Sequence, residues 1–226
     1  MKKLLLLSLV LLSAVSIRAA GKSARQVLVE HVETCEAIFQ QFQNRPEHAI
    51  PRAVLQKARG IIIVNQFKAG FILGMKGGYG VVMVKKADNS WSIPVLINAG
   101  EASLGLQLGA SATETIYVLM DDATPRLLFK DRFNIGVDAK AVAGPKAAEA
   151  VVNNREILNT PVLVYSKARG LYAGATVKAG YASRNDEANF TLYNTKYTLP
   201  ELLYSNWVQP IKEVKPLMNF VSDQSR

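Results

Sequence analysis

Residues 68–94 constrain the fold of this chain more than any other stretch of its sequence. Five glycines fall within eleven positions, at 70, 74, 77, 78 and 80, and β-branched and aromatic residues fill the spaces between them. Such a pattern is typical of strands that bend sharply or pack backbone against backbone. The tetrapeptide Ala-Asp-Asn-Ser at residues 87–90 then reads as a turn between two strands. The stretch therefore predicts tight hairpins within a strongly curved sheet.

Short strand patterns continue along the rest of the chain. Residues 103–111 alternate cleanly, with apolar side chains on one face and Gly105, Gln107 and Gly109 on the other. This alternation predicts a strand whose glycine face lies close to other backbone. Further strands are predicted at residues 61–64, 71–75, 79–85, 91–97, 116–120, 162–166 and 190–193, with an extended segment at 136–143 and a polar turn at 183–189.

Helical patterns frame these strands. Residues 22–44 place apolar side chains three or four positions apart, from Leu28 to Phe42, and their polar face is mainly acidic. A helix on a membrane surface carries Lys and Arg on that face, so docking on the domain is the preferred expectation and docking on a membrane is the alternative. Cys35, the single cysteine, lies on the apolar side and is predicted to be a buried structural thiol. Shorter helices are predicted at residues 52–58, 124–129 and 199–207, with a helical or loop insertion at 146–153 and a packed or partly mobile tail at 208–221.

The first residues predict export. Lys2 and Lys3 precede an apolar run over residues 4–15 and then small residues, which is the order of a secretory signal peptide. The run is too short to cross a bilayer. We expect residues 1–19 to be removed, leaving a periplasmic or secreted domain, residues 22–226, that can associate peripherally with a membrane. Removal of residues 1–19 takes away three basic residues, Lys2, Lys3 and Arg18, and lowers the formal net charge from +9 to +6 (9 − 3).

The basic charge favours an anionic partner. For an exported protein we expect that partner to be a membrane or an acidic polymer, and not nucleic acid. Basic motifs also repeat within the chain: Lys-Ala-Arg-Gly occurs at residues 57–60 and 167–170, and Lys-Ala-Gly followed by an aromatic residue occurs at 68–71 and 178–181. A duplicated unit of three strands is the preferred explanation, and chance similarity is the alternative. Duplication would place the cations of both copies at related positions on one sheet.

Several blocks of sequence occur together in one order: Lys-Ala-Gly-Phe-Ile-Leu-Gly at 68–74, Trp-Ser-Ile-Pro at 91–94, Ser-Leu-Gly-Leu-Gln-Leu-Gly at 103–109 and Lys-Ala-Arg-Gly-Leu-Tyr-Ala-Gly at 167–174. With these blocks the chain resembles the SYLF domain family over about residues 50–207, in particular its secreted bacterial branch. The resemblance implies a non-catalytic lipid-binding module. Some eukaryotic members also bind actin, which implies a protein-interaction or scaffolding role as the alternative.

The sequence contains no recognised motif for catalysis or for cofactor binding. The glycine-rich stretch matches neither the Walker pattern nor Gly-x-Gly-x-x-Gly. The sequence also lacks the zinc-protease, Cys-x-x-Cys and nucleophile-elbow motifs, and its two histidines both precede the strands. We therefore expect no enzyme activity, no metal site and no cofactor.

The sequence and the resemblance together predict one α+β domain. Its strongly curved, mainly antiparallel, barrel-like sheet would carry the amphipathic helix packed on it. The predicted function is binding of anionic phospholipid at the cell envelope, with an unidentified protein partner as the alternative. Headgroup phosphates would meet basic side chains, each contributing about 1 kcal/mol near an anionic surface. The candidates are Lys57, Arg59, Lys68, Lys76, Lys167, Arg169 and Lys178, with Lys22 and Arg25 as a second patch.

Overall fold

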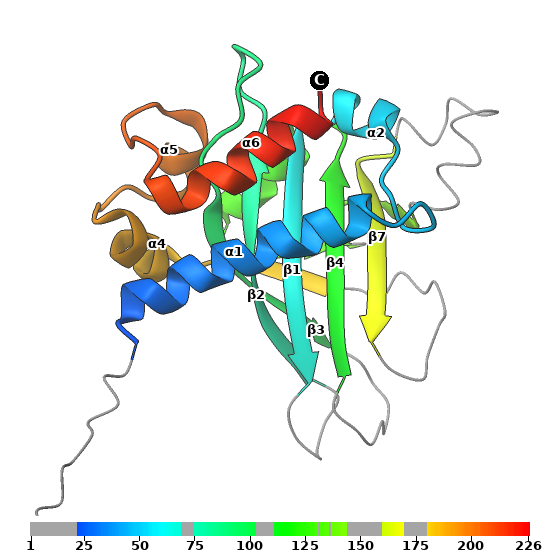
Figure 1. The fold of residues 1–226 in the computed structure, drawn as a ribbon, viewed down its shortest axis with the longest axis horizontal. Helices are drawn as coiled ribbons and strands as arrows, with labels where there is room; N and C mark the ends of the chain where they lie inside the picture. Colours follow the sequence, from blue (N-terminus) through cyan, green and yellow to red (C-terminus); the bar gives the residue numbers. More distant parts are fainter. Residues whose placement is uncertain are drawn as a thin grey trace, which may run out of the picture.

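Among the described residues, eight strands form one curled sheet in the order β5-β8-β3-β2-β1-β4-β7-β6 (Figure 1). The computed structural model describes residues 22–68, 75–102, 111–130, 132–135, 137–143, 160–169 and 180–226. The strands are β1 (Gly60–Lys68), β2 (Met75–Val84), β3 (Val95–Ala102), β4 (Ser111–Leu119), β5 (Arg132–Ile135), β6 (Ala141–Ala143), β7 (Val162–Arg169) and β8 (Gly180–Arg184). Neighbouring strands are antiparallel, except that β6 runs parallel to β7. The predicted α+β fold with a curved, mainly antiparallel sheet is confirmed.

The two edge strands, β5 and β6, are consecutive in the chain although they lie at opposite edges of the sheet. Residues 136–140 join them, a path of at most about 20 Å, and Ile135 forms an isolated bridge with Ala139. The edges must therefore approach each other, which rolls the sheet into a partial barrel. A β-carbon at Gly180 of β8 would lie 3.2 Å from the Tyr117 hydroxyl of β4, so these strands face each other across the interior.

Helix α1 (Ala24–Gln43) packs on the outer face of the sheet, as predicted from its periodicity. It begins with a capping box in which Ser23 and Gln26 satisfy each other's backbone amides. Its buried side includes Phe39 and Cys35, whose thiol donates to the Ile63 carbonyl at 3.6 Å. Burial raises the pKa of the Cys35 thiol from 9.0 to about 12, which keeps it protonated and structural. The helix therefore docks on the domain.

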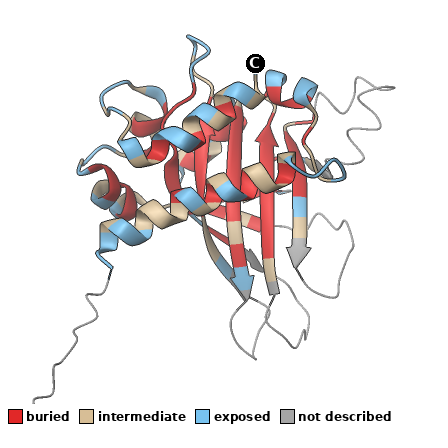
Figure 2. Ribbon diagram, in the orientation of Figure 1, coloured by how far each residue is buried: buried red, intermediate tan, exposed pale blue. Residues whose placement is uncertain are grey.

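The central strands are buried on both faces at the end where β1 begins (Figure 2). Residues 61–64 of β1 and 81–84 of β2 are each at most 1% exposed. Alternate side chains point to the partial barrel and to the helices, so one continuous core forms on both sides of the sheet. The opposite end is more open, and the Phe67 side chain near the end of β1 is 48% exposed.

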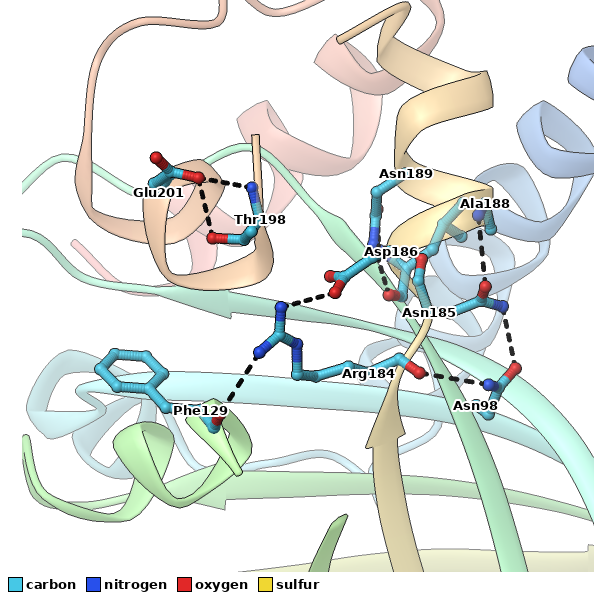
Figure 3. Close-up of polar contacts among 10 residues, drawn as sticks. Asn98, Phe129, Arg184, Asn185, Asp186, Ala188, Asn189, Thr198 and Glu201 are labelled. Carbon is cyan, nitrogen blue, oxygen red and sulfur yellow. Dashed lines mark hydrogen bonds and ion pairs between the residues drawn. The ribbon is translucent and has the colours of Figure 1, made fainter. Parts of the chain in front are cut away.

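Among the described residues, the other helices precede, connect or follow the strands, and α2 leads from α1 into β1. They are α2 (Arg52–Lys57), η1 (Thr124–Phe129), α4 (Asp186–Tyr193), α5 (Leu199–Tyr204), η3 (Lys212–Val214) and α6 (Lys215–Gln224). Figure 3 shows how α4 is attached to the sheet: the Asn185 side chain accepts from the Ala188 amide at 3.2 Å and donates to the Asn98 side chain at 2.9 Å. The fully buried Asn189 amide bonds both backbone groups of Leu96 at 2.8 Å.

Some predicted elements were wrong. Residues 190–193 belong to α4 and not to a strand. The strand predicted from Trp91 begins only at Val95, and Trp91 itself forms an isolated bridge with Lys85. The 208–221 tail is packed, and much of it is η3 and α6. Strands β5 and β8 were not predicted. The predicted strand at 71–74, the glycine face at 103–110 and the insertion at 146–153 lie outside the described residues.

Candidate functional site

The structure does not bring the two Lys-Ala-Arg-Gly motifs together. Lys57 ends helix α2 and Arg59 precedes β1, whereas Lys167 and Arg169 lie inside β7. Strand register places Arg169 opposite the far end of β1, eight strand positions from the first motif and roughly 26 Å away. The copies also differ in secondary structure. The predicted duplication with cations at related positions is therefore wrong.

The other predicted basic residues are also dispersed. The backbones of Lys68 and Lys76 lie near the open end of the sheet, and Lys178 lies outside the described residues. In the second patch, Lys22 pairs with Glu30 at 2.6 Å and Arg25 pairs with Glu213 at 3.1 Å. Those two cations are already matched by carboxylates.

Lys167 lies beneath α1 and not on a free surface. Its ammonium is 3.8 Å from Glu114 Oε2 and donates to Gln41 Oε1 of α1 at 3.3 Å. The Lys167 and Glu114 side chains are 13% and 8% exposed. Because Gln41 belongs to α1 while the charged pair spans β4 and β7, this contact fixes the helix to the sheet.

Changing Lys167 to glutamate is expected to destabilise the domain by about 3–5 kcal/mol, because two carboxylates would then share a buried site. The matched control is Lys57→Glu, which makes the same charge change at an exposed position and should stay within about 0.5 kcal/mol of the wild type. Urea unfolding gives both values. Similar stabilities of the two variants would contradict the structural role of Lys167.

A groove lies on the outer face near the open end of the sheet. Its volume is about 290 Å³, and its lining includes Leu28, Phe67 and Tyr79. The His31 ring stacks on Tyr79 with centroids 3.6 Å apart and the planes 8° apart. Burial lowers the pKa of His31. The lining residues include no lysine or arginine, so this groove does not match the predicted recognition of headgroups.

Several cations lie together at the other end of the sheet, where β1 begins, and this end is at the top of Figure 1. We call the surface that they form the upper face. The Lys85 amide donates to the Arg59 carbonyl at 2.8 Å, so these two residues lie opposite each other on adjacent strands. Arg59 Nη2 lies 3.1 Å from Asp122 Oδ2. Defined by these and neighbouring contacts, the upper face comprises Lys57, Arg59, Lys85, Lys86, Asp88, Asp121, Asp122, Arg126, Tyr197, Tyr204 and Trp207.

Exposed aromatic side chains adjoin these cations. The Trp207 ring is 63% exposed and lies 5.1 Å from the ring of Tyr197. The Lys86 ammonium donates to the side chain of Asn206, the residue before the tryptophan. Burial raises the pKa of Tyr204, and the neighbouring Arg126, which hydrogen-bonds it, opposes the rise. These contacts link aromatic residues to the cations of the upper face, of which sequence reasoning identified Lys57 and Arg59.

Other kinds of site find no support in the described part of the chain. None of its helices combines the length and the apolar character needed to cross a membrane. In the same residues, no group of three His, Cys, Asp or Glu side chains is placed to hold a metal ion. The chemistry that the upper face offers is attraction of anions together with burial of aromatic rings.

Comparison with known proteins identifies the family. The model of the Ysc84 family, described as Las17-binding protein actin regulator, matches residues 100–224, more than half of the chain. LAS seventeen-binding protein 3 of Saccharomyces cerevisiae is 27% identical over 213 residues, covering 93% of this chain and 45% of the relative. SH3 domain-containing YSC84-like protein 1 of Homo sapiens is 25% identical over 196 residues, covering 86% of this chain and 56% of the relative.

The chain spans about half the length of these curated relatives, so the match concerns the domain they share with it. No solved structure matches the chain. The family match covers strands β4 to β8 and the C-terminal helices, and the relatives extend the likeness over most of the chain. The protein belongs to the Ysc84 family of SYLF-domain proteins.

Proposed function

We propose that this protein binds anionic phospholipid membranes through the upper face, without catalysis. The observation that carries the proposal is the exposed Trp207 ring beside a cluster of cations. Tryptophan and tyrosine favour the membrane–water interface, and lysine and arginine are attracted to anionic headgroups. The five cations of the upper face outnumber its three side-chain carboxylates, Asp88, Asp121 and Asp122, and the Arg226 oxygen that accepts from Gln56 lies at its margin. The proposal includes export through residues 1–19, which would bring the domain to the cell envelope.

Trp207 supplies a direct test of membrane contact. The other tryptophan, Trp91, is 7% exposed, so a blue shift of fluorescence on adding phosphatidylglycerol vesicles is expected to come from Trp207. Replacing Trp207 with alanine should weaken vesicle binding about tenfold, the equivalent of about 1.4 kcal/mol, because an apolar ring no longer enters the interface. Val137→Ala is the control, since Val137 is 73% exposed elsewhere on the domain. Equal vesicle affinity of the two variants would remove Trp207 from the proposed surface.

A protein-interaction role is the second candidate. It is favoured by the relatives, one of which is named a LAS seventeen-binding protein, and by the family description as an actin regulator. Exposed Trp, Tyr and Arg side chains are also enriched at protein interfaces. A stable protein partner, captured by the wild type and lost in Trp207→Ala, together with no binding to anionic vesicles, would favour this role over the lipid-binding one.

A further inference from the structure

On the upper face, two cations lie opposite each other where β1 begins and β2 ends. The backbone hydrogen bond from Lys85 to Arg59 places these side chains at directly opposed positions. Like charges in such positions destabilise a sheet. Burial lowers the pKa of Lys85, and the Arg59 charge lowers it further. The fold therefore holds together two positive charges that repel each other, which is the arrangement that a bound anion would relieve.

The surroundings fix the two cations and leave them accessible. The Lys85 ammonium donates to the Gln56 carbonyl at 3.2 Å and lies 5.4 Å from the centre of the Trp91 ring. The Arg59 guanidinium meets Asp122, and these side chains are 42% and 60% exposed. An exposed pair of this kind contributes little to stability. A stronger anion can therefore take the place of the Asp122 carboxylate.

Resting on the proposed function, we infer that Arg59 and Lys85 form a clamp for a phosphate monoester. A monoester carries between one and two negative charges and three terminal oxygens, enough to engage both cations. The planar guanidinium of Arg59 can donate two parallel hydrogen bonds, while the ammonium of Lys85 acts as a compact charge. The shared chemistry fits a monoester headgroup, that of phosphatidic acid, and also inorganic phosphate in solution.

Trp91 reports on the clamp without any membrane. Its indole N–H donates to Ser225 Oγ at 2.8 Å, and its ring lies beneath Lys85. Titration with inorganic phosphate at constant ionic strength, with chloride as the reference anion, is expected to shift the NMR signal of this indole N–H to saturation. Arg59→Gln and Lys85→Gln should each weaken the apparent affinity about tenfold, because each removes a charge-assisted contact.

Two further variants separate a clamp from a loss of folding or a general charge effect. Asp122→Asn is expected to tighten phosphate binding, because the competing carboxylate is gone, and a misfolded protein could not produce that gain. Arg132→Gln removes one exposed cation from β5, where the strand register places it level with Asn98 of β3 and away from the Trp91–Lys85 bridge, and it should leave phosphate affinity unchanged. An indole signal that does not respond to phosphate, or responds alike in Arg59→Gln and the wild type, would overturn the clamp.

Vesicles distinguish the source of the phosphate. At equal surface charge, the wild type should bind phosphatidic acid more tightly than phosphatidylglycerol, a diester, and Arg59→Gln should lose this preference while still binding both. Equal binding of both lipids by the wild type, with no indole shift, would refute the clamp and leave the proposed function standing. A saturating indole shift without vesicle binding would refute the proposed function and assign the clamp to soluble phosphate.

Discussion

Adding a single methyl group at Gly80 is expected to disrupt the sheet, whereas the same change at Gly77 on the same strand should be tolerated. A β-carbon at Gly80 would lie 2.4 Å from the Ile63 carbonyl oxygen and 2.6 Å from Val64 Cγ1. Gly80 pairs directly with Val64, so even if the Val64 side chain rotated away, the backbone of the neighbouring strand would still obstruct the new methyl group. A β-carbon at Gly77 would meet nothing within 4 Å.

Thermal melting of Gly80→Ala and Gly77→Ala tests this difference. Overpacking costs about 1–3 kcal/mol, and an obstruction made of backbone belongs at or above the upper end of that range. In a domain of this size each kcal/mol lowers the melting temperature by about 2–4 °C. We therefore expect Gly80→Ala to melt about 10 °C or more below the wild type, if it folds. Gly77→Ala should melt at the same temperature as the wild type. Equal melting of the two variants would mean that β1 and β2 do not approach so closely.

The glycine-rich stretch shows what local sequence predicts well. Its spacing indicated strands packed backbone against backbone, and Gly78 and Gly80 do face the backbone of β1. The helix that begins with the Ser23 capping box was likewise predictable, because its apolar periodicity persists over five turns. Both features depend on residues that are neighbours in the chain.

Short elements were harder to predict. Phe190 and Thr191 have strand preference, and α4 is eight residues long, so its apolar pattern resembled a strand. The signals that decide for a helix lie at its ends, in the Asn185 cap and in Asn194, whose φ of 50° ends the helix in the left-handed region. Strands β5 and β8 form because the rolled sheet brings distant segments together, and four- or five-residue patterns carry little of that information.

Charge in the sequence did not show which cations share a surface. The first copy of the tetrapeptide begins at Lys57, the last residue of α2, whereas Lys167 of the second copy lies within β7, where alternation turns its side chain toward α1. Lys85 was missed because Lys85-Lys86 beside a turn resembles an ordinary solvated hairpin. Its pairing with Arg59 follows from the register of β1 and β2, which only the folded sheet defines. The sequence did offer one signal of the upper face: Trp207 is a large aromatic residue in a polar segment that Pro210 interrupts.

Liposome flotation of a charge-reversal variant tests the central claim most directly. Lys57, Arg59, Lys85 and Lys86 are changed together to glutamate, and the control variant reverses four exposed cations elsewhere: Arg45, Arg132, Lys212 and Lys215. Both variants carry the same net charge, so a difference between them reports the location of the binding surface. At about 1 kcal/mol for each removed charge, the upper-face variant should lose several kcal/mol of binding free energy.

The wild type is expected to float with phosphatidylglycerol vesicles at low salt, to bind neutral vesicles weakly, and to be released as rising salt screens the surface charge. The upper-face variant should remain at the bottom of the gradient, and the control variant should retain most of its binding. Flotation of the upper-face variant at the wild-type level, or loss of flotation in both variants alike, would contradict the assignment of membrane binding to the upper face.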